Sequence, residues 1–144
     1  LKHMNKMNPI EAYKLESPII VIIEKAEDFG KGIGEAFVRL AEKLENKGQK
    51  RDCYGLVINE NGAMNYYAAY TELYDGEARE KSLPVFTIIS GDYYAICIEY
   101  WNKNILHIGP TFDQILKSGK VDTSSPCIEF YKTEQELICM VKAI

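Results

Sequence analysis

The sequence lacks the features by which nucleic-acid-binding and metal-binding proteins are usually recognised. Its 144 residues include 17 lysines and arginines against 21 aspartates and glutamates, so the formal net charge is −4. A nucleic-acid-binding surface is normally basic, and this acidic balance argues against one. Only two histidines and four cysteines are present, and no two cysteines form a CxxC pair, which argues against a zinc site. No phosphate-binding loop is visible either, and we expect no cofactor.

Long apolar runs and a secretory signal are also missing. No apolar run approaches the roughly 18 residues of a transmembrane helix, so we expect no membrane partner. The cysteines, at positions 53, 97, 127 and 139, are widely spaced. Without a secretory signal this spacing predicts free, buried thiols in a reducing cytoplasm. The first residues, LKHMNKMNP, carry two methionines and no apolar segment, and we expect residues 1–14 to be a disordered or tag-like end.

Hydrophobic residues, by contrast, are plentiful, at 47% of the chain, and they suffice for one domain with a real core. Ten of the aromatic residues are tyrosines and only five are phenylalanines. Tyrosine has an apolar ring and a polar tip, so this surplus suits a wet aromatic pocket or an interface. Ordinary use of tyrosine as a strand former explains most of the ten equally well.

The first half of the chain predicts a β-α-β-β unit. The apolar, β-branched run 18–26 predicts a buried strand. From residue 33 apolar residues recur on one face of a helix that ends near Gly48. Residues 53–58 and 63–73 then predict two strands, joined by a hairpin turn whose strongest element is Asn61-Gly62.

The second half repeats this order after a polar linker at 74–84. Strands are expected at 85–89 and 93–100, a helix within 102–118, and strands at 126–132 and 135–144. The motif Ile33-Gly34-x-x-Phe37 recurs as Ile108-Gly109-x-x-Phe112, and Cys53 recurs as Cys127. These matches predict an internal duplication, with repeats at about 17–73 and 85–144 of a single domain over 15–144.

Four short segments in the second half resemble one known family, the GyrI-like effector-binding domain. They are Gly91-x-Tyr93-Tyr94-Ala95, Ile108-Gly109-Pro110, Ser118-Gly119 and Pro126-Cys127-Ile128-Glu129-Phe130-Tyr131. The same domain forms the ligand-binding part of some AraC-type and MerR-type transcription activators. The resemblance covers about residues 15 to 144. It implies an α+β fold in which duplicated βαββ repeats form a curved antiparallel sheet, with two helices on one face and a cleft between them.

The resemblance also implies a ligand. Family members mostly bind small molecules, often cationic or aromatic, and a glutamate that matches Glu129 here projects into the cleft. Phe37 stands where the family often has a tryptophan. No DNA-binding helix-turn-helix precedes the domain in this sequence, so we expect a free-standing version rather than a transcription activator.

The residues themselves single out Glu129, which lies in the middle of an otherwise apolar strand. Strand periodicity places Cys127, Glu129 and Tyr131 on one face. The equivalent of Glu129 in the first repeat is Gly55, whose missing side chain leaves volume for a shared, asymmetric cavity. Alternatively, Gly55 is a bulge or close-approach glycine, and Glu129 is paired to a tyrosine or arginine as part of the core, or exposed at a sheet edge.

Further candidates for the pocket are aromatic. Tyr67 lies on the strand face opposite to Tyr66 and Tyr70, so only one of these two sets can face a cleft. We predict that Tyr67 and Tyr94 line it. Trp101 stands at a helix entry, where it forms either a rim or lid of the pocket or a hydrophobic staple for the helix.

Three functions follow from these patterns. The first is a binding protein for a hydrophobic, aromatic or cationic small molecule, with Glu129 as counter-charge. The second is a hydrolase of electrophilic cyclopropane-type compounds, which some free-standing members of the family resemble, with Glu129 and Tyr67 as catalytic residues. The third is a protein-partner module, as in GyrI itself, an inhibitor of DNA gyrase. The oligomeric state stays open.

Overall fold

The computed structural model describes residues 8–28, 30–45 and 48–144. Its strands are β1 (Glu11–Leu15), β2 (Ile19–Lys25), β3 (Cys53–Glu60), β4 (Ala63–Thr71), β5 (Val85–Ile88), β6 (Gly91–Glu99), β7 (Cys127–Tyr131) and β8 (Glu136–Lys142). Its α-helices are α1 (Ile33–Lys43), α2 (Glu77–Glu80) and α3 (Ile108–Leu116), and two 3-10 turns, η1 (Trp101–Lys103) and η2 (Ile105–His107), precede α3.

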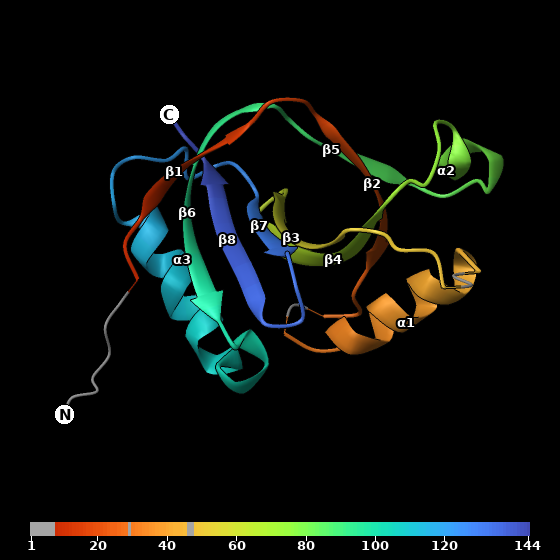
Figure 1. The fold of residues 1–144 in the computed structure, drawn as a ribbon, viewed down its shortest axis with the longest axis horizontal. Helices are drawn as coiled ribbons and strands as arrows, with labels where there is room; N and C mark the ends of the chain where they lie inside the picture. Colours follow the sequence, from red (N-terminus) through yellow and green to blue (C-terminus); the bar gives the residue numbers. More distant parts are fainter. Residues whose placement is uncertain (1–7, 29, 46–47) are drawn as a thin grey trace.

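All eight strands join one antiparallel sheet in the order β1-β6-β8-β7-β3-β4-β2-β5. The sheet curls into a half-barrel, and α1 and α3 lie on the same side of it, each packed against strands of its own repeat (Figure 1). The predicted fold class, α+β with duplicated βαββ repeats and a curved antiparallel sheet, is therefore confirmed.

The strand order carries an internal twofold relationship. Each of β1 to β4 has an equivalent among β5 to β8, in the same sequence. Replacing every strand by its equivalent gives the same strand order, read from the other edge of the sheet. The two repeats meet at the β3–β7 pair in the middle of the sheet. Each repeat also lends a strand to the other, because β1 pairs with β6 and β5 pairs with β2.

Two elements differ from the expectation. Residues 11–14 belong to β1, so the predicted disordered end is wrong for them, while residues 1–7 lie outside the described residues. β1 is short and two of its five residues, Glu11 and Lys14, are charged, but Tyr13 and Leu15 pack against the core and β6 supplies its hydrogen bonds. The polar segment 74–84, expected as a loop, contains the short helix α2.

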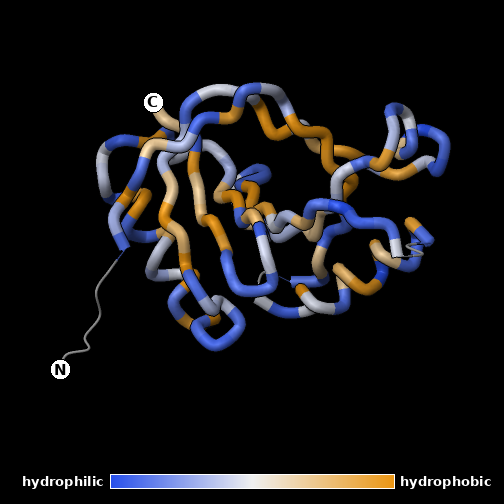
Figure 2. The backbone as a smooth tube through the Cα atoms, in the orientation of Figure 1, coloured by the Kyte–Doolittle hydropathy of each residue, from blue (hydrophilic) through white to orange (hydrophobic). Residues whose placement is uncertain are grey.

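The core has two sides, as strand alternation requires. One face of the sheet carries a cluster around Tyr54, Leu56 and Met140. The other face packs against the helices, with Leu40 of α1 in one cluster and Ile115 of α3 in another. Figure 2 shows the hydrophobic residues following the strands, with hydrophilic turns between them. In the part of the chain that the structure describes, no helix is long and apolar enough to cross a membrane.

Candidate functional site: a buried carboxylate in an aromatic cleft

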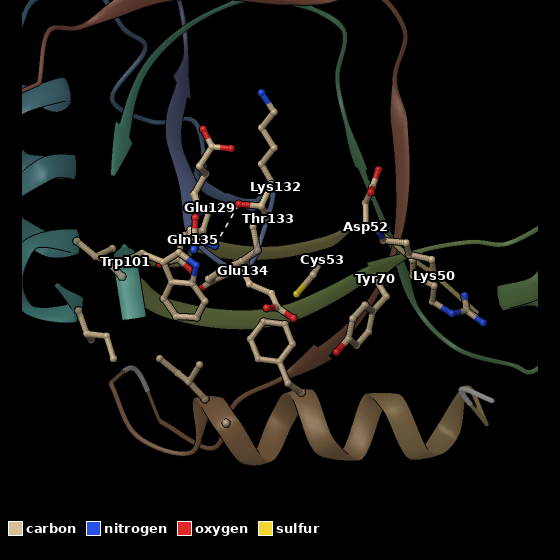
Figure 3. A pocket seen from close by; sticks show the side chains of 18 of the residues that line it. Lys50, Asp52, Cys53, Tyr70, Trp101, Glu129, Lys132, Thr133, Glu134 and Gln135 are labelled. Carbon is tan, nitrogen blue, oxygen red and sulfur yellow. Dashed lines mark hydrogen bonds between the residues drawn. The ribbon is translucent and has the colours of Figure 1, made fainter. Parts of the chain in front are cut away.

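A cleft of about 1170 Å³ lies on the helix side of the sheet. One wall is α1, which contributes Ile33, Gly34 and Phe37, and the opposite wall is the segment around η1, η2 and the start of α3. Strands β3, β4 and β7 form the floor, and the turn between β7 and β8 forms part of the rim. Figure 3 shows Trp101 and Tyr70 on opposite sides of this space, with the Cys53 sulfur between them.

Glu129 lies in the floor of the cleft and is only 6% exposed. Two phenol hydroxyls donate to the same carboxylate oxygen: Tyr66 Oη lies 2.6 Å and Tyr131 Oη 2.8 Å from Glu129 Oε1. Among the described residues, no lysine, arginine or histidine forms an ion pair with this carboxylate. A buried carboxylate held by neutral donors alone is uncommon, because ionised groups leave water at a high free-energy cost unless they are paired.

Two of the three cationic side chains that line the cleft are directed away from Glu129. Arg51 lines the cleft, but its guanidinium binds Glu77, with Arg51 Nη2 2.6 Å from Glu77 Oε2. The side chain of Lys132 points away from α1 and from the floor of the cleft (Figure 3). The negative charge of Glu129 is therefore available to whatever enters the cleft.

Burial determines the acid–base properties of this cluster. Desolvation raises the pKa of Glu129, although the two phenol hydrogen bonds act in the opposite direction. Burial and the neighbouring Glu129 charge raise the pKa of both the Tyr66 and Tyr131 phenols. The same two causes raise the pKa of the Cys53 thiol to about 12. Both tyrosines therefore remain protonated donors at neutral pH, and the thiol is a weak nucleophile.

Gly55 makes the contact between the carboxylate and Tyr66 sterically possible. It pairs with Glu129 across β3 and β7 and with Ala68 across β3 and β4. A Cβ atom at this position would lie 2.1 Å from Tyr66 Oη and 2.2 Å from Glu129 Oε1. The volume left by the missing side chain is thus filled by Tyr66 and Glu129 and is not an open cavity. Gly55 is a glycine at which other groups approach the backbone closely.

The walls of the cleft are a set of perpendicular aromatic rings. The ring of Phe37 meets those of Tyr66, Tyr70 and Tyr131 edge-to-face, with centroid distances of 6.4, 6.0 and 6.1 Å. Trp101 packs against Tyr131 at 5.0 Å, also in a T-shaped arrangement. Such an arrangement offers both ring faces and ring edges to a guest molecule.

Comparisons with known proteins show which solved structures share this fold. No protein-family model matches the sequence, and no curated protein sequence matches it significantly. Solved structures do match. An integron cassette protein from Vibrio cholerae has a TM-score of 0.70 at 11% identity, covering 96% of this chain and 97% of that one. The protein SAV2435, solved with bound tetraphenylphosphonium, has a TM-score of 0.62 at 20% identity, covering 93% and 94%. The chain has a GyrI-like fold.

A third solved structure with this fold is a hydrolase from Listeria innocua, with a TM-score of 0.56 at 7% identity, covering 99% of this chain and 95% of that one. At these identities the likeness concerns the fold alone. The GyrI-like fold is thus shared by a protein that binds a cation and by a protein described as a hydrolase.

Four residues proposed from the sequence line the cleft of this GyrI-like fold: Glu129, Phe37, Tyr131 and Trp101. Whether they bind a ligand stays a prediction. Trp101 lies in η1, lines the side wall of the cleft and packs against the cluster beneath α3.

The placement of Tyr67 and Tyr94 in the cleft is wrong. Tyr67 lies on the opposite face of β4, where its hydroxyl donates to Glu60 Oε1 at 2.5 Å. Tyr94 shares the sheet face of Glu129 but packs into the cluster beneath α3, and Lys120 Nζ lies 5.2 Å from its ring centroid. A shared face therefore does not place a residue in the cleft when a helix covers it.

Tyr66 and Tyr70 are the cleft tyrosines of β4. The hairpin turn could have identified them. A two-residue turn at Asn61-Gly62 pairs Glu60 with Ala63, and the same register pairs Gly55 with Ala68. Tyr66 and Tyr70 lie two residues on either side of Ala68, so they share the face of Gly55 and Glu129.

Within residues 8–28, 30–45 and 48–144, no three His, Cys, Asp or Glu side chains lie close enough together to hold a metal ion. All four cysteines are free. The floor of the cleft offers the buried carboxylate of Glu129, two phenol donors and several aromatic rings, and further carboxylates (Asp52, Glu134 and Glu136) line its edges.

Proposed function

We propose that this protein binds small cationic, aromatic or hydrophobic molecules in the cleft, with the cationic group beside Glu129. The observation that carries the proposal is a carboxylate, 6% exposed, that faces an aromatic cleft and has no cationic partner among the described residues. A cationic guest gains the charge of Glu129 and the faces of the surrounding rings together.

The size of the cleft supports a ligand with several rings. Small-molecule sites commonly have volumes of about 300–1,000 Å³, and this cleft, at about 1170 Å³, lies above that range. Tetraphenylphosphonium, the molecule bound to SAV2435, belongs to the class of bulky aromatic cations that such a cleft suits. A cytoplasmic location is part of the proposal, because the four cysteines are free.

Calorimetric titration with tetraphenylphosphonium tests the proposal. We expect binding by the parent protein and a loss of affinity of about tenfold or more in Glu129→Gln, since a tenfold change corresponds to about 1.4 kcal/mol. Glu42→Gln is the matched control: it removes the same charge from an exposed position of α1 that does not line the cleft. Equal affinity of the parent and Glu129→Gln would overturn the proposed role of the carboxylate.

A second candidate function is hydrolysis of electrophilic, cyclopropane-type compounds. It is favoured by one observation, the raised pKa of Glu129 next to two protonated phenols. In this role Glu129 accepts a proton from water while the water oxygen bonds to a ring carbon and the strained carbon–carbon bond breaks. A phenol hydroxyl protonates the released carbon, and the proton on Glu129 then returns to the phenolate. Tyr131, which lines the cleft, replaces Tyr67 as the phenol in this hypothesis, because the Tyr67 hydroxyl lies on the opposite face of the sheet.

Mass spectrometry after incubation with an electrophilic cyclopropane separates the two functions. Addition of one water to the compound, lost in both Glu129→Gln and Tyr131→Phe, is expected of a hydrolase. Recovery of unchanged compound that nevertheless binds to the protein is expected of a binding protein alone.

A further inference from the structure

We infer that the cleft selects cations by the shape of the charged group: it favours an ammonium or quaternary onium centre and disfavours planar amidinium and guanidinium groups. This inference rests on the proposed function. Its basis is that both hydrogen bonds that the described side chains donate to the Glu129 carboxylate go to one oxygen, Oε1.

Oxygen Oε1 of Glu129 is already occupied. A carboxylate oxygen has about two lone-pair sites, and the hydroxyls of Tyr66 and Tyr131 both donate to Oε1, at 2.6 and 2.8 Å. Within the described part of the chain, no side-chain hydrogen bond is directed to Oε2. The site therefore offers a ligand one free oxygen rather than two.

The backbone of Gly55 also restricts the position of Oε1. This oxygen lies so close to Gly55 that a Cβ atom there would be 2.2 Å away. Tyr66 is 3% exposed and packed in the cluster beneath α1, so its hydroxyl has little room to turn elsewhere. Rotating the carboxylate to present both oxygens would break its hydrogen bond with the buried Tyr66 hydroxyl, at a cost in free energy.

Amidinium and guanidinium groups need both oxygens. Their strong pairing with a carboxylate consists of two parallel N–H···O bonds, one to each oxygen. An ammonium group can bind through a single N–H to Oε2. A trimethylammonium or phosphonium centre has no N–H and uses charge and aromatic faces instead, which Phe37, Trp101 and Tyr131 supply.

Three probes that share one aromatic ring test this inference: benzyltrimethylammonium, benzylammonium and benzamidinium, all cationic at pH 7. With the parent protein we expect the first two to bind at least about tenfold more tightly than benzamidinium in calorimetric titrations at one pH and salt concentration. Tyr131→Phe frees a lone pair of Oε1, so we expect it to improve the relative affinity of benzamidinium. Tyr67→Phe, which removes a phenol from the opposite face of the sheet, is expected to leave the ratio unchanged.

The outcomes separate the inference from the proposed function. If benzamidinium binds as tightly as benzylammonium, and both depend on Glu129, the shape selection is wrong and the cation site stands. If none of the three probes nor tetraphenylphosphonium binds, the proposed function itself is overturned. An unchanged ratio in Tyr131→Phe would show that occupancy of Oε1 does not cause the selection.

Discussion

Gly55 and Glu129 face each other across the β3–β7 pair, and the space that a side chain of Gly55 would fill is occupied by the carboxylate of Glu129. The two residues hold equivalent positions in the two repeats, 74 residues apart. The centre of the sheet is therefore asymmetric at this point: one repeat contributes the charged group and the other contributes the room for it.

Gly55→Ala is expected to destabilise the fold and weaken cation binding. The added methyl group overlaps with Tyr66 Oη and Glu129 Oε1, and overpacking of this kind typically costs about 1–3 kcal/mol. Urea unfolding and titration with tetraphenylphosphonium measure the two effects. Gly109→Ala is the control, because a Cβ atom there has nothing within 4 Å. A Gly55→Ala variant with parental stability and affinity would show that the carboxylate can relocate freely.

Glu129 is expected to lower the stability of the protein at neutral pH. Its folded-state pKa is raised by burial above the ordinary 4.5, so its contribution to stability is most favourable below the unfolded pKa and is lost as the pH rises through the folded pKa. Glu129→Gln should therefore be more stable than the parent at pH 8, by about 1.4 kcal/mol for each unit of raised pKa. The difference should shrink as the pH falls toward 4.

Urea unfolding of both proteins between pH 4 and pH 8 measures this difference, with Glu42→Gln as the exposed control. Cation binding should show the related trend. Because the ionised carboxylate attracts the ligand, affinity for tetraphenylphosphonium should rise with pH until Glu129 is fully ionised. Affinity that does not change with pH would contradict the raised pKa.

A second buried carboxylate, Glu77 of α2, is expected to stabilise the fold. Arg51 and Lys81 bind its oxygens at 2.6 and 3.0 Å, and the side chains of Arg51 and Glu77 are 2% and 1% exposed. Arg51→Met leaves the buried Glu77 with Lys81 alone, and removal of one partner of a buried pair costs about 3–5 kcal/mol. Lys43→Met, which breaks a partly exposed pair with Glu24 and leaves Arg39 bound to that carboxylate, should cost less than about 1 kcal/mol in the same urea experiment.

The Glu77 pair also predicts acid sensitivity. The hydrogen bond from Arg51 holds the pKa of Glu77 at about 2. A lowered folded-state pKa contributes stability that is present above the ordinary pKa of 4.5 and is lost as the pH falls toward 2. Thermal unfolding from pH 6 to pH 2 should show this loss in the parent. The loss over this range should be smaller in Arg51→Met, and an equal loss would contradict the assignment to this pair.

Cys53 is expected to react slowly with alkylating reagents although it lines the cleft. A pKa of about 12 instead of 9 leaves about a thousandfold fewer thiolates at pH 8. Glu129→Gln removes the nearby negative charge and should accelerate modification by iodoacetamide, read as site-specific mass shifts. Tetraphenylphosphonium should slow the reaction in the parent by covering the thiol. Rapid labelling of Cys53 in the parent would contradict the raised pKa of its thiol.

Periodicity and turn chemistry were enough to predict the order of helices and strands in each repeat, whereas their arrangement in one curved sheet was implied by the family resemblance. The apolar face that includes Leu40 and the Asn61-Gly62 turn are local signals, and local signals determine helices and hairpins. β1 was missed because a short, charged edge strand has no such signal. Its place in the sheet depends on pairing with β6, nearly 80 residues away, and only the folded chain provides that contact.

The site was harder to predict than the fold, and the two tyrosine choices show why. Alternation along β4 separates Tyr67 from Tyr66 and Tyr70, but only the β3–β4 register shows which of these faces Gly55 shares. Tyr94 shares the face of Glu129, and its cover by α3 is a tertiary feature that alternation does not report. Alternation along a strand identifies faces, whereas the extent of a cleft depends on where the helices end.

The reciprocal pairing of β1 with β6 and of β5 with β2 means that neither repeat is complete by itself. A lone copy of either repeat would leave an edge that only a second copy could pair. Because both repeats belong to one chain, equivalent positions on either side of the seam can carry different residues, here an acid and a glycine. Two identical copies of one repeat could not present this difference.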